Sequence, residues 1–418
     1  MPEMLQENGY RTAGIGKYHV GISFDDGEGN TADDFYFHDV DFTEPLLDGP
    51  THHGFDEYFG VPGNTEDPLD TEPRVLIRND RFTFTDRSRM KLIGMKKREG
   101  RILAAPDWDL RNLGALYLGE AQAFIDRQAA KSDEPFFLYY VPNANHFQRH
   151  PDGDYAVPDA IGETPIKGSS RYSDNVPASD REDMVLENDV VFGKLLEKLK
   201  ATDDPRWDGH KLIENTLVIF TSDNGPWLNY GDHAGSAGPL REGKGTMFDG
   251  GCRESTLMWW PGTIPAGSEC TTPAMTIDLL PTVAELIGAR LPKHPIDGKS
   301  IVKLLKGTSD TSPHEAYYFY YGRQLQAIRM GKWKLHFPHG YRTMAGRPGG
   351  TGGIPTHYSQ AKIGLALFDM EKDIGETTDV KAKHPNIVKH LQALGDKMRN
   401  ELGDNGRTGT GTRPPGQL

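Results

Sequence analysis

The stretch NTLVIFTSDNG (Asn215–Gly225) decides the fold class, because a short apolar run breaks off there into polar, turn-forming residues. A second run of this kind, PFFLYYV (Pro135–Val141), also ends in loop-like residues. Short apolar runs rich in β-branched and aromatic residues predict strands. Because both runs are apolar throughout rather than alternating, we expect them to lie in a sheet that is covered on both faces.

Helical patterns lie between and after these strands, at Asp180–Lys200 and Thr276–Ala289. Alternating strands and helices predict an α/β architecture, in which functional groups gather at the carboxyl ends of the strands. From about Ser312 the sequence changes to AYYFYYGRQLQAIRMGKWKLHF and then LALFDM, which predict antiparallel strands, and a helical pattern, NIVKHLQALGDKMRNEL, follows. We therefore predict a large domain at 1–311 and a smaller antiparallel-sheet domain at 312–418.

The composition excludes some classes of protein. With 60 acidic and 47 basic residues, the 418-residue chain has a net charge of -13, which disfavours nonspecific binding to nucleic acid. It contains no apolar run long enough to span a membrane, and the stretch MPEMLQENGY lacks the apolar core of a signal peptide. Two cysteines, Cys252 and Cys270, are too few for a disulfide scaffold. An anionic substrate would need a local cluster of positive groups.

Polar residues follow the predicted strand at 215–221. Asp223 and Asn224 supply oxygen ligands of the kind that calcium and magnesium prefer, although an Asn-Gly turn with an Asp cap has the same sequence. Further on, GPLREGKGTMFDGG resembles a P-loop, but Gly245 stands where the magnesium-binding Ser or Thr belongs. We reject the P-loop. Lys244 on a Gly-rich turn is suited to contact an anion, and an exposed, solvated lysine is the alternative.

Two further segments carry candidate residues. His146 follows the strand that ends at Val141, and Lys17 and His19 lie in GIGKYHVG, where strand alternation predicts that both face the same side. Each of these residues alone has a structural alternative, either a packed histidine or a solvated lysine. Together with Asp223, Asn224 and Lys244 they form a set suited to stabilising charge on a tetrahedral oxyanion ester.

The segments around these residues resemble the formylglycine-dependent sulfatases, that is, the arylsulfatase-like family. GYRTAGIGKYHVG resembles the second sulfatase signature, and further similarity lies in HHGFDEYFG, FTSDNGP, LREGKGTMFDGGCRE and LFDMEKDIGETTDV. The resemblance covers nearly the whole chain. It implies an alkaline-phosphatase-like α/β fold with a smaller C-terminal antiparallel-sheet domain, and a hydrolase of sulfate esters.

The resemblance also implies roles for the site residues. Asp223 and Asn224 would bind calcium, and Lys17, His146 and Lys244 would contact the sulfate group. His19 would hydrogen-bond the nucleophile, and His233, in YGDHAGS, would line the substrate entrance. The partner would be a sulfated small molecule or glycan, and the compartment would be periplasmic or extracellular. Specificity would depend on loops such as residues 65–106 and the segment near Gly350.

One departure from the family pattern concerns the nucleophile. Sulfatases carry an Asp-Asp metal pair and a Cys-x-Pro-Ser-Arg motif, whose Cys or Ser becomes formylglycine, before the second signature. Neither stands before the second signature in these 418 residues, and no cysteine has the motif, since Cys252 precedes RES and Cys270 precedes TTPA. The pairs Asp25-Asp26 and Asp33-Asp34 come after the signature and follow no apolar strand, so we interpret them as loop carboxylates. We expect that an upstream segment is missing, that the calcium site is incomplete, and that this chain alone is inactive.

Two alternatives remain open on the sequence. One is a non-catalytic, sulfatase-like protein that binds anions, and an in-frame Cys-x-Pro-Ser-Arg upstream in the gene would exclude it. The other is a phosphate or phosphonate ester hydrolase of the same superfamily, which rates on paired aryl sulfate and aryl phosphate substrates would distinguish.

Overall fold

The computed structural model describes residues 1–65, 72–94, 100–131, 134–146, 156–352 and 354–413. The chain forms two compact units, Met1–Thr216 and Leu217–Leu418. This division differs from the predicted domain boundary after residue 311, which stays a prediction.

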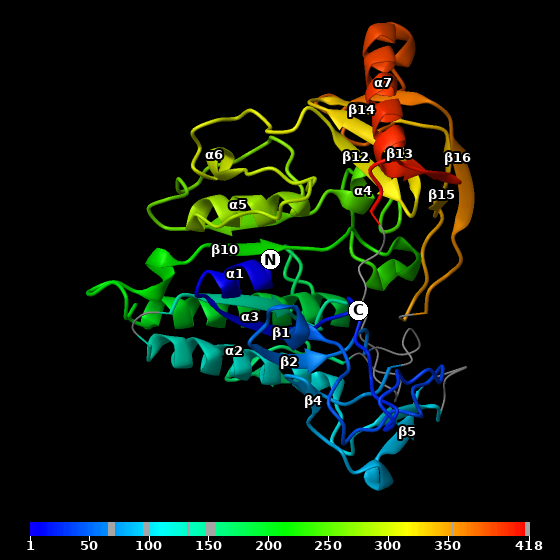
Figure 1. Cartoon of the computed structure of the whole chain (residues 1–418). Helices are drawn as coiled ribbons and strands as arrows, with labels where there is room; N and C mark the ends of the chain where they lie inside the picture. The colour runs from blue at the N-terminus through cyan, green and yellow to red at the C-terminus, as the bar shows by residue number, and fades with distance from the viewer. Residues whose placement is uncertain (66–71, 95–99, 132–133, 147–155, 353, 414–418) are drawn as a thin grey trace. The chain divides into compact units, whose positions relative to one another are not determined.

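The first unit is built on a sheet whose described strands lie in the order β4-β3-β2-β1-β7 (Figure 1). β1 pairs in parallel with β2 on one side and β7 on the other, and β3 and β4 add antiparallel pairs. The carboxyl ends of the three parallel strands therefore meet at one edge of the sheet. The bounds are Arg11–Lys17 (β1), Glu57–Val61 (β2), Ile77–Arg78 (β3), Arg81–Phe82 (β4) and Phe136–Val141 (β7).

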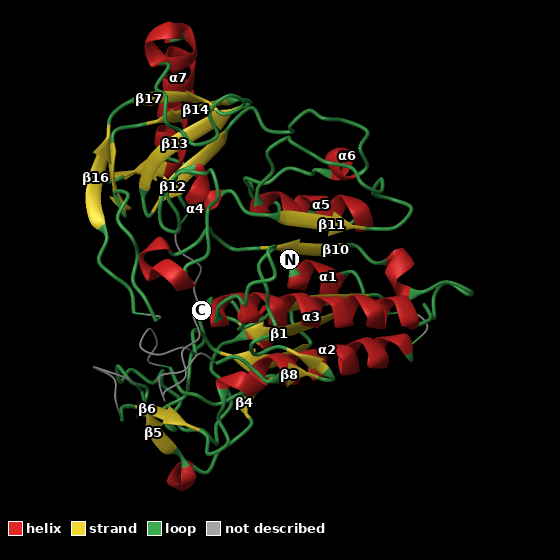
Figure 2. Ribbon diagram, turned by 180° about the vertical axis from the view of Figure 1, so that it is seen from behind, coloured by secondary structure: helices red, strands yellow, loops and turns green. Residues whose placement is uncertain are grey.

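Helices α2 and α3 of this unit lie side by side in both views, and α2 packs against β1, β2 and β7 (Figures 1 and 2). The predicted helix at 180–200 is confirmed as α3, which begins at a capping box formed by Ser179 and Glu182. The helices are α1 (Pro2–Glu7), α2 (Leu113–Ala129) and α3 (Asp180–Ala201).

Short elements complete the first unit. The strand pairs are β5 (Lys91–Ile93) with β6 (Ile102–Ala104), and β8 (Ala160–Ile161) with β9 (Thr164–Pro165). The 3-10 helices are η1 (Pro50–His53), η2 (Arg87–Arg89), η4 (Leu110–Asn112) and η5 (Leu212–Asn215).

The second unit begins with an antiparallel strand pair, β10 and β11, followed by helix α5, which confirms the predicted helix at 276–289. Pro281 lies in the first turn of α5, where its missing N–H costs no intrahelical hydrogen bond, and Gly288 in the left-handed conformation ends the helix. The bounds are β10 (Val218–Thr221), η6 (Leu228–His233), α4 (Asp249–Cys252), β11 (Thr256–Trp259), η7 (Thr276–Asp278), α5 (Leu279–Ile287) and α6 (Val302–Leu305).

The predicted antiparallel sheet near the C-terminus is confirmed, with described strands in the order β12-β13-β14-β17. Helix α7 covers one face of this sheet with Val388, Leu391 and Leu394, which pack on Ile328 and Leu335 (Figure 1). The bounds are β12 (Tyr317–Tyr321), β13 (Gln324–Met330), β14 (Trp333–His336), β15 (His339–Thr343), β16 (Ser359–Ile363), β17 (Ala366–Asp369), η8 (Lys381–Lys383), α7 (Pro385–Leu402), β18 (Gly403–Asp404) and β19 (Arg407–Thr408).

The expectation that both apolar strands are covered on both faces is wrong. In β7, Tyr139 is 49% exposed, and in β10, Phe220 is 41% exposed. Among the described strands, β7 lies at one end of its sheet and β10 pairs with β11 alone, so neither has the two flanking strands of a central position. Continuous apolar character therefore predicted the strands correctly but not their burial.

Candidate functional site

Lys17 is the last residue of β1, so it lies at the carboxyl edge of the sheet in the first unit. The glycine before it, Gly16, is required by close strand packing. A Cβ on Gly16, whose φ is +111°, would fall 1.8 Å from the carbonyl oxygen of Val141 in β7. Lys17 Nζ donates to Asn64 Oδ1 at 3.4 Å. The Gly-rich sequence thus brings the lysine to the strand end, beside the loop that follows β2.

His19 does not share a strand face with Lys17. β1 ends at Lys17, and His19 is exposed and adopts a left-handed conformation with φ 49°. Its backbone N–H donates to the carbonyl of Pro62 at 2.8 Å. The predicted alternation is wrong at this point because it holds only while the backbone remains extended.

His146 follows β7, the strand next to β1, so the first unit brings it and Lys17 to the same edge of the sheet. The loop that carries it is held by helix α3. Arg181 Nη1 donates to the carbonyl of Asn145 at 2.8 Å, and Asn188 Nδ2 donates to the carbonyl of Ala144 at 3.1 Å. The described part of this loop ends at His146.

The sequence interpretation missed Arg74, which is 1% exposed. Its Nη1 donates to the carbonyls of Asn64, at 3.1 Å, and Glu72, at 3.2 Å. Arg74 therefore fixes the backbone of the residue that contacts Lys17. The only available signal was an arginine next to the apolar residues VLI at 75–77, and it was weak, because arginine is seldom fully buried unless it is paired.

In the second unit, Asp223 and Asn224 come directly after β10, and Asn224 Nδ2 donates to Asp223 Oδ1 at 2.9 Å. The next residues are joined by backbone hydrogen bonds to the segment that contains Lys244. Gly225 N–H donates to Gly251 O at 3.2 Å, and Lys244 N–H donates to Pro226 O at 2.9 Å. The unit therefore brings Asp223, Asn224 and Lys244 onto adjoining backbone segments.

Glycines allow these segments to pack backbone against backbone. A Cβ on Gly225 would fall 1.9 Å from Gly250 O, and one on Gly243 would fall 2.4 Å from Pro226 O. The Lys244 ammonium lies over the ring of Trp227, 5.1 Å from its centroid, a cation–π contact that the sequence interpretation did not foresee.

Glu254 is a further carboxylate close to Asp223. Burial, together with the Asp223 carboxylate, raises the pKa of Glu254 to about 7. Its Oε1 is buried and has no hydrogen-bond partner among the described residues. Across the described chain, however, no group of three or more His, Cys, Asp or Glu side chains is arranged to hold a metal ion.

His233 ends η6 and is 8% exposed, with Nε2 3.4 Å from Asp232 Oδ1. The segment near Gly350 packs on η6, since Gly350 N–H donates to Asn229 O at 2.9 Å. The predicted specificity segment and His233 are therefore neighbours in the second unit. Lys17, His19 and His146 belong to one unit, and Asp223, Asn224, His233 and Lys244 belong to the other.

An α/β body with polar groups at its strand ends and a C-terminal antiparallel sheet backed by a helix defines the alkaline-phosphatase-like fold class. Within that class the chain belongs to the sulfatase family, whose sequence model matches residues 1–289. The model for the C-terminal region of aryl-sulfatase matches residues 312–410, and that for the C-terminal part of N-sulphoglucosamine sulphohydrolase matches residues 243–339.

Curated relatives agree with this assignment. The chain is 30% identical to N-acetylgalactosamine-6-sulfatase of Canis lupus familiaris over 410 residues, covering 94% of this chain and 66% of the relative. It is 29% identical to arylsulfatase A of Homo sapiens over 406 residues, covering 94% of this chain and 69% of the relative. The chain thus spans about two thirds of the length of these relatives.

A solved structure shares the fold. The sulfatase PsFucS1 from Pseudoalteromonas sp. superposes with a TM-score of 0.65 at 23% sequence identity, covering 95% of this chain and 72% of that one. No helix in the described part of the chain is long and apolar enough to cross a membrane.

Proposed function

We propose that this chain belongs to a sulfuric ester hydrolase and binds the sulfate group of an aryl or glycan sulfate. Lys17 and His146 of the first unit and Lys244 of the second are the proposed sulfate-binding residues. His19 is proposed to hydrogen-bond the nucleophile. His233 is proposed to line the substrate entrance. The relatives named for N-acetylgalactosamine-6-sulfate and aryl sulfate hydrolysis support this substrate class.

The observation that carries the proposal is the position of the motif residues after strand ends. Lys17 ends β1, His146 follows β7, and Asp223 and Asn224 follow β10. Groups at the carboxyl ends of strands in α/β folds commonly bind ligands. Ammonium groups beside a sulfate ester stabilise the negative charge that grows on its oxygens during hydrolysis. In a chain with a net charge of -13, such local cations are needed to hold an anion.

Binding is the direct test of this proposal. Calorimetric titration of the chain with inorganic sulfate should show saturable binding that weakens about tenfold or more in Lys17→Ala and in Lys244→Ala, the loss expected for a direct charged contact. Lys389→Ala, which removes an exposed lysine from α7, is the control and should bind sulfate normally.

The same titration distinguishes the alternatives. Binding of phosphate in clear preference to sulfate would favour a phosphate ester hydrolase. Equal affinity in all three lysine variants would overturn the proposed site.

We further propose that Asp223 and Asn224 bind a calcium ion. Their side chains offer oxygen atoms, the ligands that calcium takes. The buried Glu254 Oε1, which has no hydrogen-bond partner among the residues that the structure describes, lies close to Asp223 and suits a cation too. These residues fit the ion but fall short of the six to eight oxygens that calcium normally takes. A bound calcium ion would supply positive charge at the strand end.

Calcium binding should accordingly be weak. We expect a dissociation constant of about 10⁻⁴ M or weaker in calorimetric titration, as for protein sites with few fixed ligands. Asp223→Ala should abolish the heat of binding, whereas Asp310→Ala, an exposed aspartate in the same unit, should not. Tight binding that survives the loss of both Asp223 and Asn224 side chains would refute this assignment.

A further inference from the structure

We propose that Arg342, on β15, is a positioning residue for Lys244, an inference that rests on the proposed role of Lys244 in sulfate binding. Arg342 Nε donates to the backbone carbonyl of Lys244 at 2.8 Å, and Nη2 donates to the same oxygen. The guanidinium also stacks on the ring of Tyr358, with 4.7 Å from Cζ to the ring centroid. A charged, rigid donor group thus holds the peptide unit that carries the anion-binding side chain.

The turn around Lys244 is held on its other side as well. The Lys244 N–H donates to Pro226 O, and its ammonium lies over the Trp227 ring. A lysine on a Gly-rich turn would otherwise sample many positions, and fixing it before the ligand arrives lowers the entropy cost of binding. Arg342 supplies the contact to the carbonyl side of this peptide.

Gly245 shows that the Arg342 contact shapes the turn. Its φ is +81°, and a Cβ there would fall 2.4 Å from Arg342 Nη2. A side chain at residue 245 would therefore strain the backbone and displace the guanidinium from the Lys244 carbonyl. The position at which a P-loop would have Ser or Thr must be glycine here for this physical reason.

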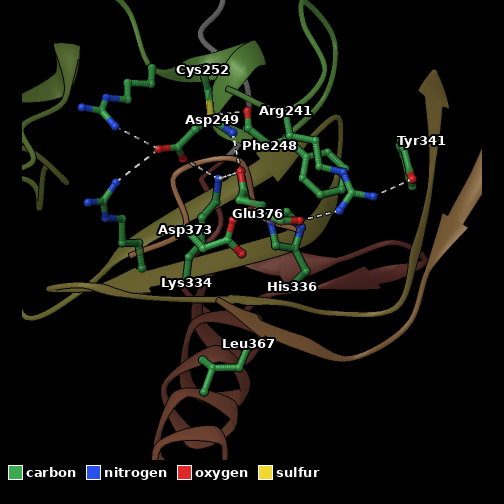
Figure 3. Close-up of polar contacts among 12 residues, drawn as sticks. Arg241, Phe248, Asp249, Cys252, Lys334, His336, Tyr341, Leu367, Asp373 and Glu376 are labelled. Carbon is green, nitrogen blue, oxygen red and sulfur yellow. Dashed lines mark hydrogen bonds and ion pairs between the residues drawn. The ribbon is translucent and has the colours of Figure 1, made fainter. Parts of the chain in front are cut away.

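A buried cluster anchors the end of the same segment in the C-terminal sheet (Figure 3). Lys334 Nζ lies 2.6 Å from Asp249 Oδ1 and 3.1 Å from Glu376 Oε1. Phe248 packs between the Arg241 guanidinium, 4.1 Å from its centroid, and the stacked ring of His336, 4.5 Å between centroids. The residues that follow Lys244 are thereby fixed to β14, so the position of the turn relative to Arg342 is well defined.

The positive charge of Arg342 also favours the binding of an anion beside Lys244. Within the part of the chain that the structure describes, Arg342 makes no ion pair. Its positive charge therefore remains available beside Lys244 and raises the local potential that an anion experiences.

Calorimetric titration of the full chain with inorganic sulfate tests the inference. We expect Arg342→Gln to weaken sulfate binding about tenfold, as a slight displacement of a binding group does, and Arg342→Lys to recover part of the affinity. Arg347→Gln is the matched control, because Arg347 contacts backbone carbonyls of the same β15–β16 region but not Lys244. The melting temperatures of Arg342→Gln and Arg347→Gln should be similar.

Gly245→Ala provides a second route, since it keeps the arginine but separates it from the Lys244 carbonyl, and it should also weaken sulfate binding. If Lys244→Ala weakens binding while Arg342→Gln and Gly245→Ala bind sulfate normally, the positioning role is refuted and the proposed function stands. If Lys244→Ala itself binds normally, the proposed sulfate site is wrong and the inference fails with it. Should Arg342→Gln not fold, Arg342→Lys and Gly245→Ala decide the question.

Discussion

Replacing Lys334 with Met is expected to lower the free energy of unfolding by about 3–5 kcal/mol, the usual cost of removing one partner from a buried ion pair. Lys334, Asp249 and Glu376 are each no more than 2% exposed. Methionine has a similar volume but no charge, so the two buried carboxylates would lose the ammonium that they share. Asp249 would keep its pair with Arg329, and Glu376 would keep its hydrogen bond with His336. The loss would therefore come from weakened charge compensation rather than from a cavity.

Urea unfolding at pH 7 measures this effect. Lys332→Met is the matched control, because Lys332 lies two residues earlier and pairs with Asp369 at 3.0 Å in a partly exposed position, where an ion pair contributes about 0–1 kcal/mol. A Lys334→Met variant that lost no more stability than Lys332→Met would contradict the interpretation of the cluster.

The cluster also makes stability depend on pH. Burial alone would raise the pKa of Glu376, but the Lys334 ammonium and the His336 hydrogen bond outweigh it and lower the pKa to about 2. Burial lowers the pKa of His336 to about 4. Both folded-state pKa values lie below the ordinary ones, so stability is present at neutral pH. It is lost as the pH falls, first through the His336 range and then through that of Glu376.

Replacing Glu187 with Gln, unlike replacing Lys334 with Met, is expected to raise the free energy of unfolding, by about 3 kcal/mol at pH 7. Glu187, on α3, is 3% exposed, and its Oε2 has no hydrogen-bond partner among the described residues. Its Oε1 lies so close to α2 that a Cβ on Gly114 would fall 1.9 Å from it. Burial raises the pKa of Glu187 to about 8.

The sign of this effect follows from proton binding. The folded protein retains the Glu187 proton up to about pH 8, whereas the unfolded chain releases it near the ordinary pKa of 4.5. Stability is therefore fully present below pH 4.5 and falls as the pH rises towards 8. Glutamine resembles the protonated acid in shape and charge and removes this dependence.

Urea unfolding at pH 5 and pH 8 tests the prediction. Glu187→Gln should be more stable than the parent at pH 8 and close to it at pH 5. Glu197→Gln, on the exposed face of the same helix, should change stability little at either pH. A Glu187→Gln variant with the parent's stability at pH 8 would show that the carboxylate is solvated in the folded state.

The sequence predicted helices and strands whose apolar residues form a clear pattern. It did not predict the burial of side chains that depends on contacts between distant parts of the chain. Helix α3 and the strands β7 and β13 followed from local patterns. In β14 the alternation of Trp333, Lys334, Leu335 and His336 indicates a strand but does not reveal the environment of the lysine and the histidine. Both are fully buried, because α7 covers one face of the strand and Asp249 and Phe248 lie against the other.

The candidate site shows the same division. Lys17, His146, Asp223 and Asn224 could be placed at strand ends from the sequence, since each closely follows an apolar run. Arg342 could not, because its partner is a backbone carbonyl 98 residues away and leaves no local pattern. When a residue positions another by bonding its backbone, no spacing in the sequence predicts that role.

The contact between Arg342 and the Lys244 carbonyl also has a thermodynamic consequence. Free-energy coupling between two parts of a protein is reciprocal, so a sheet that fixes the anion-binding lysine is itself stabilised when an anion binds there. Sulfate in excess of its dissociation constant would raise the melting temperature of the second unit by mass action. The melting temperature of the protein would then depend on the concentration of its ligand. Bound substrate would stabilise the sheet that holds its own binding lysine in place.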